Sequence, residues 1–166
     1  MNEENEDLSE LSPVNSHPIA ARILTDEFYW DCVDDNSPFG NDTGADTLEF
    51  LREWREENPE SNPVRFLNQL LKEWEVTDDY WDITDPSEVQ RLLDADEFSF
   101  NTRDEAVIAL AFGQLILEGE VESEIKRRAA LAIARQAQPA IINRWGEHAS
   151  ERAERLQKMK AALEQV

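Results

Sequence analysis

Apolar residues recur at helical spacing along most of the chain, and this periodicity constrains the fold more than any other feature of the sequence. No segment alternates apolar and polar side chains in the sustained two-residue period of a half-buried strand. The chain also has only five Gly residues, too few for the turns of a strand-and-hairpin protein. The expected helices cover about 43–58, a stretch from Pro63, a short stretch from Pro86, about 103–118, about 123–138 and about 148–164. We therefore predict an all-α fold, an irregular bundle of five to six helices.

Local start and stop signals support these helix boundaries. Asn41 or Asp42 can cap the first long helix with its side-chain oxygen. Thr102 and Glu105 have the spacing of a capping box, which predicts a helix start directly after Thr102. Pro139 interrupts the apolar stripe of the segment before it, so we expect a kink or a restart there.

The length of 166 residues suits a single domain. Residues 1–16 are polar, acidic and without periodic pattern, so we expect a flexible acidic tail followed by one helical domain over 17–166. No apolar run approaches the roughly 20 residues of a membrane span, and no basic region of a secretory signal precedes one. The single cysteine, Cys32, excludes an internal disulfide framework and a cysteine-based zinc cluster. We expect no membrane association and a cytoplasmic location.

Charge is distributed unevenly along the chain. There are 37 acidic and 16 basic residues, a formal net charge of −21 at pH 7. Residues 1–100 hold 27 acidic and 6 basic side chains, whereas residues 101–166 hold ten of each. The predicted domain therefore has an acidic half over 17–100 and a charge-balanced half over 101–166. Such a charge opposes direct binding to nucleic-acid phosphate and suits contact with a basic surface, with general solubility as the alternative explanation.

Two segments combine carboxylates with large aromatic side chains. Carboxylates steer a basic partner towards a surface, and Tyr and Trp supply rigid contact area there. The first segment covers residues 75–85, and the second runs from Phe28 to Asp35. The alternative is that the aromatic side chains only pack these loops against the core. The predicted partner-binding residues are Asp78, Asp79, Tyr80, Trp81, Asp82, Asp85, Asp34 and Asp35.

The acidic surface leads to a hypothesis about function. We expect a non-enzymatic binding protein that neutralises a basic protein partner, in the manner of an inhibitor, an immunity protein or an antitoxin. The partner would be a nuclease or another nucleic-acid-binding protein, because carboxylates at i and i+4 on a helix imitate the charge of nucleic acid coarsely. Two alternatives remain open: a small metal- or carboxylate-dependent enzyme, and a structural homo-oligomeric subunit such as a homodimer.

Catalytic motifs are absent from the sequence. The two histidines, His17 and His148, lie near opposite ends of the chain, and no nucleophile elbow or glycine-rich phosphate loop is present. Aspartates cluster around 31–46 and 78–85, but neither cluster matches the spacing of a calcium-binding loop. We therefore expect no catalytic residues, no metal site and no cofactor.

The charge-balanced half has one basic cluster. It consists of Lys126, Arg127, Arg128 and Arg135. We expect these side chains to neutralise carboxylates of the same domain or to lie on a solvated face, rather than to bind a separate anion.

The segment from Ser37 to Leu48 resembles the signature of a group of small bacterial proteins of unknown function. That signature is Phe-x-Asn-Asp followed by a helix with Ala-x-Asp or Ala-x-Glu. The matching residues are Phe39, Asn41, Asp42, Ala45 and Asp46. The resemblance implies an all-α fold and a bacterial or phage-like origin, and it brings no known catalytic residues. Physically, a helix cap and an apolar anchor at Phe39 account for the motif.

Overall fold

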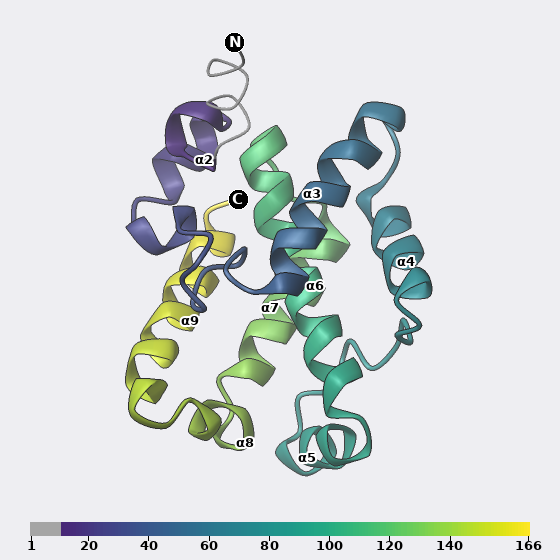
Figure 1. Ribbon diagram of the computed structural model, residues 1–166, viewed down its shortest axis with the longest axis vertical. Coiled ribbons are helices and arrows are strands. Elements are labelled where there is room, and N and C mark those ends of the chain that lie inside the picture. The colour runs from purple at the N-terminus through teal and green to yellow at the C-terminus, as the bar shows by residue number, and fades with distance from the viewer. Residues whose placement is uncertain (1–10) are drawn as a thin grey trace.

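The computed structural model describes residues 11–166, and these residues form helices joined by loops, with no strand among them (Figure 1). The α-helices are α2 (Pro18–Ile23), α3 (Asp42–Glu57), α4 (Pro63–Glu73), α5 (Pro86–Ala95), α6 (Glu97–Glu118), α7 (Ser123–Gln136), α8 (Pro139–Ile142) and α9 (Ala149–Glu164). The 3-10 helices are η1 (Pro13–Asn15), η2 (Glu27–Trp30) and η3 (Asn143–His148). The prediction of an all-α bundle is confirmed.

Helix α6 runs through the middle of the molecule, and the other helices pack around it (Figure 1). Its residues from Ala106 to Ile116 are almost all apolar, and every one of them is buried. A helix that is apolar on all sides is stable only when other elements cover all of its sides. Helices α2, α3, α4, α5 and α7 pack against α6 and cover its sides. Gly113 permits the close approach of α3, because a Cβ there would lie 3.1 Å from the Leu51 side chain.

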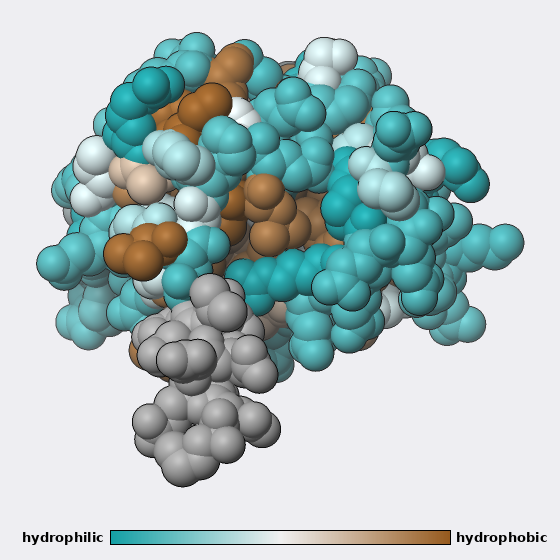
Figure 2. Space-filling model, turned by 90° about the horizontal axis from the view of Figure 1, so that it is seen from above, coloured by the Kyte–Doolittle hydropathy of each residue, from teal (hydrophilic) through white to brown (hydrophobic). Residues whose placement is uncertain are grey.

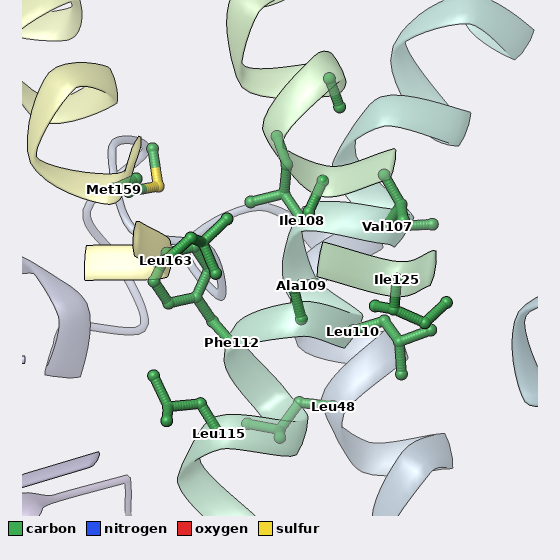
Figure 3. Close-up of a cluster of buried hydrophobic side chains, with 14 of the residues drawn as sticks. Leu48, Val107, Ile108, Ala109, Leu110, Phe112, Leu115, Ile125, Met159 and Leu163 are labelled. Atoms are coloured by element: carbon green, nitrogen blue, oxygen red, sulfur yellow. The ribbon is translucent and has the colours of Figure 1, made fainter. Parts of the chain in front are cut away.

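The main core lies between α6 and the helices α3, α7 and α9 (Figure 3). Phe112 of α6 lies beside Leu163 of α9, and Leu48 of α3 lies beside Leu115 of α6 (Figure 3). All four side chains are buried. Each contributes about 1.5–3 kcal/mol through removal of apolar area from water. The apolar periodicity of these helices therefore marks side chains that form the core.

A smaller apolar cluster closes the end of the molecule that carries α5 and α8 (Figure 1). Its buried members are Val89, Leu92, Leu93, Phe100 and Ile141. The cluster joins the first turn of α6 to α5 and α8, and this part of the molecule forms one side of the pocket described below.

The start of α3 agrees with the start predicted from the sequence, whereas the start of α6 differs from its predicted position. The Asn41 side chain accepts a hydrogen bond from the Gly44 amide at 2.7 Å and so caps α3. Helix α6 begins at Glu97 rather than after Thr102, because the Asp96 carboxylate accepts from the Ser99 amide at 3.1 Å. The capping box at Thr102 was therefore wrong, and Thr102 is a buried residue inside the helix.

The expected break at Pro139 is confirmed. Helix α7 ends at Gln136, and the short helix α8 restarts at Pro139, whose missing amide hydrogen costs nothing in a first turn. Gly146 has φ 56° inside η3, and this left-handed turn redirects the chain into α9.

The flexible tail predicted over 1–16 falls largely on residues 1–10, which lie outside the described residues. Within the described part, Pro13–Asn15 form η1, and Leu11 packs against the main core. The His17 amide then donates to the Ile116 carbonyl at 2.8 Å. Residues 11–16 therefore belong to the folded domain.

The surface at the end that carries α2 is mainly hydrophilic, with hydrophobic residues gathered in a few patches (Figure 2). None of the helices in residues 11–166 has both the length and the apolar character needed to cross a membrane.

Candidate functional site

The 75–85 loop, predicted as a partner-binding segment, lies against α6 and α7 and is held there by Trp81. Trp81 is 6% exposed, and its Nε1 donates to Asp78 Oδ1 at 2.8 Å. The guanidinium of Arg128 on α7 covers the ring at 5.0 Å from its centroid. Trp81 is thus a core anchor, the alternative that the sequence had left open. Tyr80 is 44% exposed, with φ 66° and Arg103 at 5.5 Å from its ring centroid.

Arginines from α6 and α7 offset much of the negative charge of this loop. Arg128 Nη1 lies 3.6 Å from Asp78 Oδ1, and Arg127 pairs with Asp82. Arg103 donates to the Thr77 carbonyl at 3.2 Å and lies 4.0 Å from Asp79. These pairs are partly or fully exposed at their carboxylates and contribute little stability individually.

Arg135 fixes the loop backbone from inside the molecule. Its Nη1 donates to the Trp81 carbonyl at 2.8 Å and to the Ile83 carbonyl at 2.9 Å. Its Nη2 donates to Asp104 Oδ1 at 2.9 Å, and Gln136 Nε2 donates to Asp104 Oδ2 at 3.0 Å. Burial raises the pKa of Asp104, and the Arg135 charge opposes that shift. For the arginines of the basic cluster, the expected pairing with carboxylates of the same domain is confirmed; Lys126 instead donates to the Val166 carbonyl.

The remaining predicted site residues have other roles. Asp85 caps α5 by accepting from the Glu88 amide at 3.2 Å. Asp34 accepts from the Asn36 amide at 2.9 Å, which shapes the loop before α3. Asp35 lies at the edge of a pocket on a different part of the molecule from the 75–85 loop, together with Arg152.

That pocket, which we call the polar pocket, lies between the N-terminal half of α6, η3, α9 and the loop before α3. Its volume is about 440 Å³, within the usual range of small-molecule sites. The residues that line it are Asp35, Asn41, Glu97, Asn101, Glu105, Gln136, Ile141, Arg144, Trp145 and Arg152. The sequence did not bring these residues together, because they come from the loop before α3 and from α6, α7, α8, η3 and α9.

Two oppositely charged residues of the polar pocket are strongly desolvated. Arg152 is 8% exposed, and burial lowers its pKa to about 10. Its guanidinium lies 4.6 Å from the centroid of the Trp145 ring. Burial also raises the pKa of Glu105, and the Thr43 hydroxyl and the Arg152 charge oppose that shift. Titratable groups with such shifts gather at binding and catalytic sites more often than elsewhere.

The second surface feature is a row of carboxylates on the outward face of α3, which we call the acidic ridge. Its exposed members are Asp42, Asp46, Glu49, Glu53, Glu56 and Glu57. They recur about once per helical turn and lie opposite the buried Leu48 and Leu51. In the 75–85 loop, by contrast, Arg127 pairs with Asp82 and Arg128 lies beside Asp78. The spacing of the ridge carboxylates is visible in the sequence.

A groove between α3 and α4 borders this ridge. It has a volume of about 220 Å³, an apolar floor and carboxylates along its edges. We call it the α3–α4 groove, and its lining residues are Phe50, Glu53, Trp54, Glu57, Phe66, Gln69, Leu70 and Glu73. Phe50 is 38% exposed, and Trp54 and Phe66 lie 5.5 Å apart between ring centroids.

The cysteine and the two histidines, residue types that serve in catalysis and metal binding, lie in separate surroundings. Cys32 is an exposed free thiol, and His17 Nδ1 accepts from the Ile19 amide at 3.1 Å. His148 lies on the surface, next to Glu147 and Glu151. Within residues 11–166, no group of three or more His, Cys, Asp and Glu side chains is arranged to hold a metal ion.

Among known proteins, the chain is similar to the uncharacterized protein YfeS of Escherichia coli (strain K12), with 32% identity over 133 residues. The matched region is 80% of this chain and 54% of YfeS, so the chain spans about half the length of this relative. No protein-family model and no solved structure matches the chain. The similarity agrees with the expected resemblance to bacterial proteins of unknown function.

Proposed function

We propose that this chain is a non-enzymatic binding protein that takes a basic segment of a protein partner into the α3–α4 groove. The observation that carries the proposal is the combination of apolar floor and acidic edges in that groove. An amphipathic helix with Leu-type residues on one face and Lys or Arg beside them complements both parts.

The acidic ridge extends this surface along α3. Its six carboxylates span about 22 Å of helix at a rise of about 1.5 Å per residue, or one charge per roughly 4 Å. One strand of B-DNA carries a charge about every 3.4 Å. The carboxylate spacing of the ridge is therefore close to the phosphate spacing of a nucleic-acid strand, with Arg52 and Arg55 on the same helix. This spacing supports a nuclease or another nucleic-acid-binding protein as the partner.

The 75–85 loop has a smaller part in the proposal than the sequence assigned to it. Asp78, Asp79 and Asp82 keep exposed area, but neighbouring arginines offset their charges. We therefore assign them to the periphery of the interaction. In biological terms, the proposal is an inhibitor, immunity or antitoxin role in the cytoplasm of a bacterium. It includes membership of the group of bacterial proteins that share the Phe39–Asp46 motif.

The test uses two fluorescently labelled peptides of identical composition. One is an amphipathic helix with Leu on one face and Lys on both flanks of that face, and the other is its scrambled version. The triple variant Glu53→Gln/Glu57→Gln/Glu73→Gln removes the acidic edges of the groove. The triple variant Asp94→Asn/Glu120→Gln/Glu164→Gln removes the same charge at exposed positions elsewhere.

Anisotropy titrations at low and high salt give the dissociation constants. We expect the amphipathic peptide to bind more tightly than the scrambled one, and high salt to weaken binding. The groove variant should weaken it by about tenfold, equivalent to about 1.4 kcal/mol. Equal weakening by both triple variants would show attraction to net charge alone and would contradict the groove as the binding surface.

A further inference from the structure

The polar pocket contains a buried cation whose hydrogen-bonding capacity is mostly unused. A guanidinium has five N–H donors. Within residues 11–166, Arg152 makes one hydrogen bond, from Nη1 to the Asn36 carbonyl at 3.3 Å, and Nε has no acceptor. Trp145 covers one face of the group but supplies no acceptor for these donors. Leaving charged donors unpaired away from water is costly, so an anionic group placed here would be strongly favoured.

Oxygen acceptors lie in the same pocket and beside it, and two of them have no donor. Asn101 Oδ1 is buried and has no hydrogen-bond partner. Glu105 follows one turn later on α6, so both side chains lie on the pocket-facing side of the helix. Asn36 Oδ1, beside Arg152 in a small adjoining cavity, also lacks a donor. These oxygens are suited to an ammonium or amide group.

The surrounding wall is rigid, and the Phe39–Asp46 motif builds part of it. Asn41 lines the pocket and at the same time caps α3. The backbone around it is tightly packed, because a Cβ on Gly40 would lie 1.7 Å from the Asp34 carbonyl oxygen. A Cβ on Gly44 would lie 2.0 Å from the Pro38 carbonyl oxygen. A preformed wall lowers the entropy lost when a ligand binds.

We infer that the polar pocket binds a small zwitterion of the α-amino-acid type. The carboxylate of the ligand would accept from Arg152, and its ammonium group would donate to Glu105 and Asn101. A simple anion would satisfy Arg152 and leave the acceptors unpaired next to Asp35 and Glu97. A simple amine would leave the Arg152 Nε donor without an acceptor. This inference is independent of the α3–α4 groove.

The first experiment uses the full chain and millimolar concentrations of the free L-α-amino acids, one at a time. Thermal unfolding detects stabilisation, and calorimetric titration of any stabilising amino acid gives its affinity. Matched compounds separate the two charges: the carboxylic acid without the amine, and the amine without the carboxylate. We expect an amino acid to bind, and each matched compound to bind at least about tenfold more weakly.

Variants then locate the binding site. Arg152→Lys keeps the charge but loses the planar fork of donors, and Glu105→Gln keeps the shape but loses the charge. The matched control is Arg155→Lys on the same helix, where the guanidinium lies over Phe28 and pairs with Glu151 and Glu154. We expect both pocket variants to weaken amino-acid binding by about tenfold, and the control to leave it unchanged.

Folding defects are separated from loss of binding by the unfolding temperature of each variant without ligand. A pocket variant that unfolds at or above the temperature of the parent but no longer binds supports the inference. Three results would overturn it: no amino acid binds, the carboxylic acid alone binds as tightly as the amino acid, or binding survives both Arg152→Lys and Glu105→Gln.

Discussion

Arg135 and Asp104 form the most buried ion pair among the described residues, each side chain being 2% exposed. Removing two charges from water costs several kcal/mol per ion. A buried pair is therefore stable only when hydrogen bonds satisfy the donors and acceptors of both side chains. Asp104 accepts from Arg135 and Gln136, and Arg135 also binds two loop carbonyls. The pair therefore positions the 75–85 loop more than it adds net stability.

Breaking this pair should be costly, because a charge is then left buried without a partner. We expect Asp104→Asn to lower the free energy of unfolding by about 3 kcal/mol. The exposed control Asp94→Asn should change it by less than about 0.5 kcal/mol. Urea unfolding followed by circular dichroism measures both values. Similar values for the two variants would show that Arg135 finds another partner.

Glu105 provides a prediction on pH. Burial raises the pKa of its carboxyl in the folded state, so the folded protein holds this proton more tightly than the unfolded chain. Stability from this group is therefore present at pH below the ordinary glutamate pKa and is lost as pH rises through the raised value. We expect Glu105→Gln to be more stable than the parent at neutral pH, and this advantage to shrink on acidification. Unfolding curves of both proteins across pH measure the difference, and a constant difference would contradict the assignment.

At the scale of the elements, local signals predicted most helices, and contacts distant in sequence decided the rest. Pro63, Pro86 and Asn41 mark helix starts through their own backbone and side-chain chemistry, which the sequence displays. The start of α6 was missed because two capping patterns overlap, and Asp96 rather than Thr102 is used. The 75–85 loop was read as a free surface because the arginine that holds it, Arg135, lies more than 50 residues away.

The turn into α3 allows a prediction on glycine. Gly44 lies inside a helix, where Ala normally stabilises, but a Cβ there would lie 2.0 Å from the Pro38 carbonyl oxygen. We expect Gly44→Ala to lower the free energy of unfolding by about 3 kcal/mol through this clash. Gly146 has φ 56° and ψ −124° with nothing near its Cβ position, so Gly146→Ala meets no clash and should cost about 1–2 kcal/mol through backbone strain alone. Chemical unfolding compares them, and an equal loss would mean that the backbone before α3 moves aside.

At the scale of the whole molecule, folding brings acidic residues of the 75–85 loop to arginines that lie far away in the sequence. The formal net charge of −21 was evident from composition, but its placement was not. Arginines from α6 and α7 meet carboxylates of the 75–85 loop, whereas the acidic ridge keeps six exposed carboxylates on one face of α3. The pocket around Arg152 is also a property of the assembled fold, because its lining comes from residues 35–152.

This charge distribution links stability to partner binding. Carboxylates crowded on one helix repel one another, so salt should raise the unfolding temperature of the protein by screening them. The groove variant Glu53→Gln/Glu57→Gln/Glu73→Gln should unfold at a higher temperature than the parent at low salt and respond less to added salt. The variant Asp94→Asn/Glu120→Gln/Glu164→Gln removes the same charge from dispersed sites and should gain less. If this dispersed variant gains as much in unfolding temperature as the groove variant, repulsion is spread over the molecule. If the groove variant gains more and also loses peptide binding, the crowded carboxylates serve partner binding at a cost in stability.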